Sequence, residues 1–97
     1  MPAYIIGRID VRDPARYRQY IQATPAVVAR FGGRFIARGG ELLTLEGPQE
    51  KRRLVIIEFP SLEKAKQFFH SDEYVEVKKL RAGAARAEFV MVNGVVP

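Results

Sequence analysis

Few side chains in the sequence are suited to acid–base chemistry. The single histidine, His70, has an unperturbed pKa close to neutral pH and could exchange a proton with a substrate. Glu58 carries a carboxylate that could abstract a proton. We therefore predict His70 and Glu58 as candidate catalytic residues. An alternative for His70 is a solvent-facing cation at a helix end, where the helix dipole favours positive charge.

A second group of side chains is suited to holding a small molecule. Tyr17 and Tyr20 share one face of a predicted helix, and Arg38 ends a predicted strand. A guanidinium binds a carboxylate with two parallel hydrogen bonds, and tyrosine rings offer apolar area with a polar tip. We predict Tyr17, Tyr20 and Arg38 as ligand-binding residues. The alternatives are core packing for the tyrosines and, for Arg38, an ion pair with Glu58.

Composition argues against several other kinds of chemistry. The chain has no cysteine, which excludes disulfides, thiolate metal sites and thiol nucleophiles. One histidine and the lack of a paired-acid cluster lead us to predict no metal site and no cofactor. Haem ligation by His70 has no second residue to support it. The glycine pairs Gly32-Gly33 and Gly39-Gly40 lack the spacing of a phosphate loop and are predicted to form turns.

Charge and hydropathy bear on partners and location. The net charge is +5, but acidic residues are interspersed, and the clusters 51–53 and 78–81 are predicted to be solvated surface. The sheet face offers only Tyr4 for base stacking, so we predict no nucleic-acid partner. No segment approaches the ~20 apolar residues of a membrane span, and no leader segment is evident. We predict a cytoplasmic protein that does not bind membranes.

Hydrophobic alternation predicts four strands within one domain that spans residues 1–97. The strands cover residues 3–11, 34–38, 53–59 and 88–92. Residues 41–46 are predicted to continue the second strand or to fold back beside it.

Helix-capping signals place the helices between these strands. Asp13 caps a first helix that Gly32-Gly33 ends, and Pro25 is predicted to kink or break it. Ser61 and Ser71 cap two later helical segments, and Gly83 ends the second of them. The order is βαββαβ, the ferredoxin-like pattern of an α+β fold with a four-stranded antiparallel sheet.

Alternation also divides the strand residues between two faces of the sheet. The set predicted to lie under the helices is wholly non-polar: Ile5, Gly7, Ile9, Val11, Phe35, Ala37, Val55, Ile57, Phe59, Phe89 and Met91. The opposite set mixes apolar residues with three basic and three acidic ones: Tyr4, Ile6, Arg8, Asp10, Arg34, Ile36, Arg38, Leu54, Ile56, Glu58, Glu88, Val90 and Val92. This face is too apolar for open water, which indicates self-association as a homodimer.

A ligand cavity is predicted on the helix-facing side of the sheet. Gly7 and Ala37 leave little side-chain volume beneath Tyr17 and Tyr20. A break at Pro25 would let the two halves of the helix splay above them. The alternative is that the small residues only make room for the tyrosine rings.

Several segments resemble one known family. They are residues 32–40, 45–47, 58–61 and 71–74, and the likeness extends from Tyr4 to about Arg81. Together they are similar to the domain of unknown function thirteen-thirty family, within the dimeric α+β barrel group. The resemblance implies a ferredoxin-like monomer and a dimer whose sheets close a barrel. It supplies no reaction, because fold does not determine function.

The combined hypothesis is a small cytosolic homodimer of unknown function. We expect it to bind a small apolar, aromatic or acidic molecule between sheet and helices, and it is a candidate cofactor-free enzyme. The alternative is a non-catalytic dimeric scaffold or partner-binding module.

Overall fold

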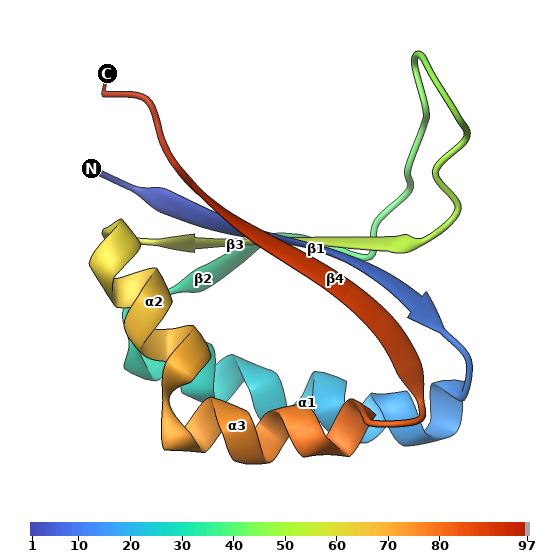
Figure 1. Ribbon diagram of the computed structural model, residues 1–97, viewed down its shortest axis with the longest axis horizontal. Helices are drawn as coiled ribbons and strands as arrows, with labels where there is room; N and C mark the ends of the chain where they lie inside the picture. Colours follow the sequence, from blue (N-terminus) through green and yellow to red (C-terminus); the bar gives the residue numbers. More distant parts are fainter. Residues whose placement is uncertain (97) are drawn as a thin grey trace.

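The computed structural model describes residues 1–96 and confirms the βαββαβ order (Figure 1). Its elements are β1 (Ala3–Val11), α1 (Pro14–Arg30), β2 (Arg34–Arg38), β3 (Arg53–Phe59), α2 (Leu62–His70), α3 (Asp72–Lys78), the short 3-10 helix η1 (Lys79–Arg81) and β4 (Ala85–Asn93). β4 begins three residues earlier than the sequence pattern predicts, since Ala85 already pairs with Val11.

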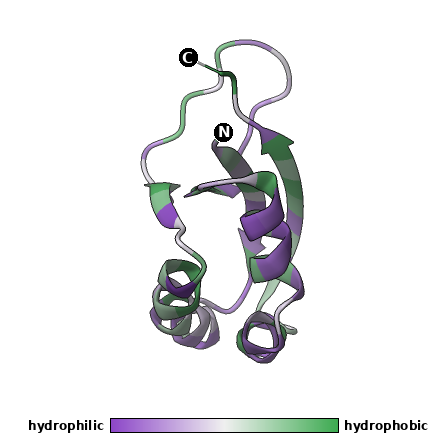
Figure 2. Ribbon diagram, turned by 90° about the vertical axis from the view of Figure 1, so that its left-hand side faces the viewer, coloured by the Kyte–Doolittle hydropathy of each residue, from purple (hydrophilic) through white to green (hydrophobic). Residues whose placement is uncertain are grey.

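The four strands form one antiparallel sheet in the order β2-β3-β1-β4. All helices cover the same face of this sheet, and the opposite face is left open (Figures 1 and 2). Each helical connection buries its apolar side against the sheet, and both do so on this one face.

The core lies between the sheet and the helices. Phe59 on β3, Phe68 on α2 and Tyr74 on α3 are each at most 1% exposed. The Phe68 ring lies 5.1 Å from Phe59 and 4.6 Å from Tyr74, measured between ring centroids. Burial of such aromatic area is the main favourable term in folding, so this cluster fixes α2 and α3 on the sheet.

Gly32 ends α1 as predicted. Its φ is 78°, a conformation that costs glycine little because it has no Cβ. The Gly32 amide donates to the Ala29 carbonyl and the Gly33 amide to the Val28 carbonyl, both at 3.0 Å. This pair of bonds is the Schellman arrangement that satisfies the last carbonyls of a helix.

Pro25 does not break α1, so a break, one of the two outcomes expected at this proline, is wrong. The helix runs without interruption from Pro14 to Arg30. A proline lacks the amide that would bond the carbonyl four residues earlier, which here belongs to Ile21. The Ile21 carbonyl instead accepts a hydrogen bond of 2.6 Å from Arg38 Nη2. An outside donor therefore compensates for the missing helix bond.

The segment after β2 is a loop, not the strand predicted for residues 41–46. Residues 40–51 have no strand pairing, and the loop projects from the body of the protein (Figure 1). The Glu50 amide donates to Thr44 Oγ1 at 2.8 Å. Leu43 and Leu45 are 74% and 92% exposed, so alternation of apolar residues here does not reflect burial against this chain.

Candidate functional site: a cleft between helix α1 and the sheet

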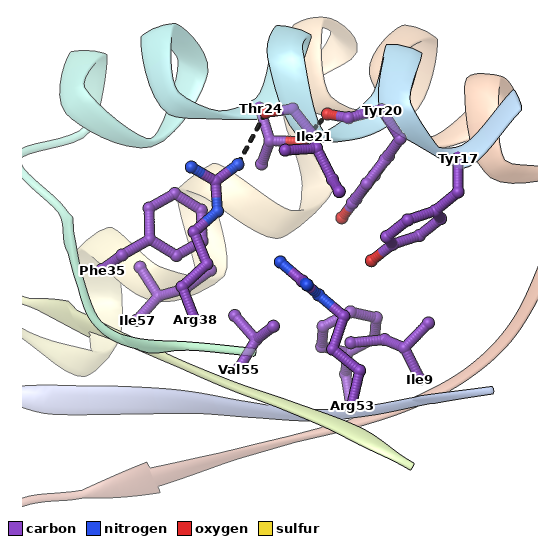
Figure 3. A pocket seen from close by; sticks show the side chains of 11 residues that line it. Ile9, Tyr17, Tyr20, Ile21, Thr24, Phe35, Arg38, Arg53, Val55 and Ile57 are labelled. Carbon is purple, nitrogen blue, oxygen red and sulfur yellow. Dashed lines mark hydrogen bonds between the residues drawn. The ribbon is translucent and has the colours of Figure 1, made fainter. Parts of the chain in front are cut away.

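A cleft opens between α1 and the strands β2 and β3 (Figure 3). It is lined by Ile9, Tyr17, Tyr20, Ile21, Thr24, Phe35, Arg38, Arg53, Val55, Ile57 and Phe89. The cavity volume is about 20 Å³, which is room for about one water molecule. With the open mouth included, the empty space is about 320 Å³. A ligand larger than water therefore has to occupy the mouth as well.

A β-bulge in β2 turns Arg38 toward this cleft. Phe35 pairs with Ile57, but Ala37 pairs with Ile56, so Ile36 is an extra residue in the ladder. An extra residue reverses the side-chain alternation that follows it. Arg38 pairs with Val55 and lies on the helix-facing side. The predicted faces of Ala37 and Arg38 are therefore both wrong, and for Arg38 the error favours a place in the pocket.

The Arg38 guanidinium is held firmly at one wall of the cleft. Its Nη2 bonds the Ile21 carbonyl, and its Cζ lies 4.2 Å from the centroid of the Phe35 ring. Burial lowers the pKa of Arg38, and the positive charge of Arg53 lowers it further. The effect of Arg53 on this pKa indicates that the two positively charged guanidinium groups lie close together in the cleft.

Arg53 is the second guanidinium of the cleft, and sequence analysis missed it. The cluster at residues 51–53 was expected to be solvated, yet the Arg53 guanidinium points into the space between the sheet and α1 (Figure 3). Its Nε is buried and has no hydrogen-bond partner among residues 1–96. A usable signal was present, because Arg53 is in phase with Val55 and Ile57, which were predicted to face the helices.

Tyr17 and Tyr20 present their hydroxyl ends to the same space (Figure 3). Burial raises the pKa of both phenols, and the Arg53 charge partly opposes this rise at Tyr17. Tyr20 also shares a buried 2.6 Å hydrogen bond with the hydroxyl of Tyr74. Both cleft phenols are therefore neutral at physiological pH, and Tyr17 can donate a hydrogen bond into the cleft.

Arg81 lies behind Tyr20 and is only 9% exposed, although residues 78–81 were expected to be solvated surface. Its Cζ lies 5.5 Å from the Tyr20 ring centroid and 5.2 Å from that of Phe89. The interactions with rings reduce the cost of burying this charge. The expectation of a solvated surface is wrong for Arg81 and for Arg53.

The cleft does not lie over the small residues that were expected to create it. A Cβ on Gly7 would come within 2.3 Å of the Phe89 side chain. The ring of Phe89, which pairs with Gly7 across β1 and β4, therefore fills that space. Ala37 lies on the other face because of the bulge. The residues that line the opening instead include Tyr17, Tyr20, Arg38 and Arg53.

The two predicted catalytic residues lie outside the cleft. His70 is exposed at the end of α2, where its ring lies 5.7 Å from that of Phe69. Glu58 is on the open face of the sheet and accepts a 2.9 Å hydrogen bond from Arg34 Nε. The structure thus groups Tyr17, Tyr20 and Arg38 and separates them from His70 and Glu58.

The open face of the sheet pairs most of its charges within the chain. Besides the pair at Glu58, Arg52 contacts Glu88, and Arg8 lies 3.3 Å from Glu50. Apolar residues lie between these pairs: Ile6, Leu54 and Ile56 are half-buried, and Ile36, Val90 and Val92 are about half exposed. The face therefore combines neutralised charge with uncovered apolar area.

Neither a metal cluster nor a membrane-spanning helix occurs within residues 1–96. No group of three or more His, Cys, Asp or Glu side chains is arranged to hold a metal ion in this part of the chain. No helix among the described residues is both long and apolar enough to cross a bilayer.

Topology and cleft together define the class: an α+β protein of ferredoxin-like fold with an arginine- and tyrosine-lined cleft under its helices. The sequence profile of the family described as "Domain of unknown function (DUF1330)" matches residues 2–95. The chain belongs to this family, as the sequence resemblance implied. None of the curated proteins matches the chain.

Solved structures share this fold. A protein of unknown function from Rhodopseudomonas palustris is 24% identical with a TM-score of 0.75, over 99% of this chain and 84% of that one. SnoaB from Streptomyces nogalater, a cofactor-independent oxygenase, is 14% identical with a TM-score of 0.70, over 99% and 95%. A dimeric ferredoxin-like protein of unknown function from Bacteroides fragilis is 18% identical with a TM-score of 0.64, over 96% of each chain. At these identities the similarity concerns the fold.

Proposed function

We propose that the protein binds a small organic anion with an apolar or aromatic body in the cleft between α1 and the sheet. One observation carries this proposal. The cleft is lined by two guanidinium groups, those of Arg38 and Arg53, and by no carboxylate from residues 1–96. Two like charges in a confined space repel each other, and an anion between them removes that repulsion.

The rest of the lining supports the same class of ligand. Tyr17 offers a neutral phenol as a hydrogen-bond donor, while Tyr20, Phe35 and Phe89 offer aromatic walls. Pockets for small molecules are commonly apolar with a few converging polar groups. His70 and Glu58 have no part in this proposal because neither lines the cleft, and their catalytic roles stay predictions.

We further propose that the protein is a homodimer that packs through the open face of the sheet. The ion pairs on that face are already formed within the chain, so a second copy can cover its valines and isoleucines without burying lone charges. Solved structures of the same fold from Bacteroides fragilis and Thermobifida fusca are dimeric, which supports this arrangement.

A calorimetric titration of the wild-type protein tests the binding proposal. Benzoate combines a flat apolar body with an anionic group, and benzamide is its neutral counterpart of nearly equal shape. We expect benzoate to bind and benzamide to bind at least about tenfold more weakly, because charge-assisted hydrogen bonds are the stronger ones. Benzoate affinity should also fall as salt is added.

Equal affinity for both probes would contradict a site that selects anions. A stable dimer that binds neither probe would favour the alternative of a non-catalytic scaffold. The dimer itself is tested by light scattering, which should give about twice the chain mass of 11.0 kDa.

A further inference from the structure

We infer that Arg53, and not Arg38, forms the main contact with the acidic group of the ligand, and that this group is a carboxylate on a flat apolar body. The inference rests on the proposed function and assigns the two guanidinium groups of the cleft to different tasks. Arg38 closes the wall toward α1, and Arg53 is left free to bind.

The Arg38 guanidinium is already engaged by the protein. Pro25 has no amide to donate, so the Ile21 carbonyl would be left without its helix partner. Arg38 Nη2 supplies that hydrogen bond at 2.6 Å, and the Phe35 ring covers the group at 4.2 Å. Turning toward a ligand would cost Arg38 this bond, because an unpartnered carbonyl inside the protein is unfavourable.

The Arg53 guanidinium is less firmly engaged, and its neighbour is a residue of the cleft itself: its Cζ lies 5.9 Å from the centroid of the Tyr17 ring. Its Nε is buried and unpartnered within residues 1–96. The salt bridges of the described chain are formed by other basic residues, and none includes Arg53. Buried polar groups are nearly always hydrogen-bonded in folded proteins. Arg81 Nε is also unpartnered, but Arg81 does not line the cleft. At Arg53, an acid group bound to the Nη groups at the end of the side chain would supply a partner that the guanidinium lacks among residues 1–96.

Gly39 gives the Arg53 side chain its path into the cleft. A Cβ at this position would come within 2.3 Å of Arg53 Nη1 and 2.6 Å of its Cζ. Gly39 also has a φ of 70°, a conformation that side chains with a Cβ rarely adopt. The Gly39 amide donates to the Leu54 carbonyl at 2.8 Å, which fixes the turn beside the start of β3. The turn at Gly39 therefore fixes the backbone at the point where the Arg53 side chain passes into the cleft.

The shape of the site favours a carboxylate on a flat body. The fork of a guanidinium matches the two oxygens of a carboxylate. The neighbouring Tyr17 hydroxyl points into the same space (Figure 3) and can donate a further hydrogen bond. Next to these groups the cavity volume is about 20 Å³, so the body of the ligand has to lie in the open mouth of the cleft.

Calorimetric titrations of three variants test this assignment with benzoate, benzamide and phenyl phosphate as probes. Arg53→Gln should weaken benzoate binding by about tenfold or more and leave benzamide nearly unchanged, since it removes a charge-assisted hydrogen bond. Arg38→Gln should have the smaller effect on affinity but should lower stability. Arg18→Gln, an exposed position on α1, is the control for general loss of charge.

Several outcomes would overturn the inference. If Arg38→Gln weakens benzoate binding as much as Arg53→Gln does in a folded protein, the two tasks are not divided. If phenyl phosphate binds more tightly than benzoate, the acidic group is not a carboxylate. If the wild-type protein binds no probe, the proposed function itself fails, whereas wild-type binding that Arg53→Gln leaves intact contradicts only the role of Arg53.

Discussion

The two faces of the sheet use arginine in opposite ways. On the open face Arg34, Arg52 and Arg8 each contact a carboxylate of the same chain. On the helix-facing side Arg38 and Arg53 line a cleft to which the described part of the chain contributes no acidic side chain. Paired charges suit a surface that another protein covers, and unpaired charges suit a site that an anion enters. This difference supports the proposal that one face serves assembly and the other binds a ligand.

The largest effect is expected for a charge placed in the open face. Val90 is 54% exposed in the single chain, so Val90→Asp should not disturb the monomer core. In a dimer the new carboxylate would be buried without a partner, which costs several kcal/mol. We expect light scattering at micromolar concentration to show a monomer. Val75→Asp on α3, where Val75 is 44% exposed, is the control and should stay dimeric; equal behaviour of the two variants would contradict assembly through the sheet.

Removing Arg38 should cost stability on the cleft side. Arg38→Gln leaves the Ile21 carbonyl without its donor, and we expect a loss of about 1–3 kcal/mol in urea unfolding. Pro25→Ala restores the helix amide that can bond this carbonyl. The cost of Arg38→Gln should therefore be smaller when it is combined with Pro25→Ala. The same cost with and without the proline would show that Arg38 does not compensate for it.

The bond between Tyr20 and Tyr74 should appear as coupling between two substitutions. Either Tyr20→Phe or Tyr74→Phe removes one hydroxyl and leaves the other buried without its partner, at a cost of about 1–2 kcal/mol. The double substitution should cost less than the sum, because no orphaned hydroxyl is left. Strict additivity in urea unfolding would indicate that the 2.6 Å contact contributes little.

A methyl group at Gly39 should lower both the stability of the protein and its affinity for benzoate. Gly39→Ala strains a backbone with a φ of 70°, at a cost of about 1 kcal/mol. It also forces the end of the Arg53 side chain to move, so benzoate affinity should fall. Gly40→Ala is the matched control, because no atom of residues 1–96 outside Gly40 and its two sequence neighbours lies within 4 Å of a Cβ there. Unchanged benzoate affinity in a folded Gly39→Ala protein would separate Gly39 from the site.

The smallest effect is expected at an ion pair of the open face. Arg34→Gln removes the 2.9 Å contact with Glu58, in which the Arg34 side chain is 73% exposed. Exposed ion pairs contribute about 0–1 kcal/mol, so unfolding in urea should change little. If Arg34→Gln lowered the free energy of unfolding by more than this and Arg38→Gln did not lower it, the comparison between the two faces would be reversed.

The fold could be predicted from local sequence signals, and the structure confirms these signals. Asp13 and Ser61 both cap helices as predicted, through bonds to the amides of Arg16 and Lys64. Strand alternation correctly placed Ile5, Ile9 and Ile57 in the core, because neighbouring strands in register keep the same parity. Such features depend on residues close in sequence or on unbroken alternation.

The site was harder to predict because it depends on an interruption of that pattern. The single extra residue at Ile36 moves Arg38 to the other face, and nothing in a run of alternating residues marks a bulge in advance. The link from Pro25 through the Ile21 carbonyl to Arg38 joins residues that are distant in sequence. Arg53, by contrast, could have been found from its phase with Val55.

We propose that the helix-side cleft binds an organic carboxylate through the Arg53 guanidinium, which forms no salt bridge within residues 1–96. Nitrogen-15 NMR of the arginine side chains during a benzoate titration tests it most directly. We expect the Arg53 Nε–H signal to shift on addition of benzoate, while those of Arg34 and Arg52 on the open face do not. Shifts confined to the open face, or none at saturating benzoate, would contradict it.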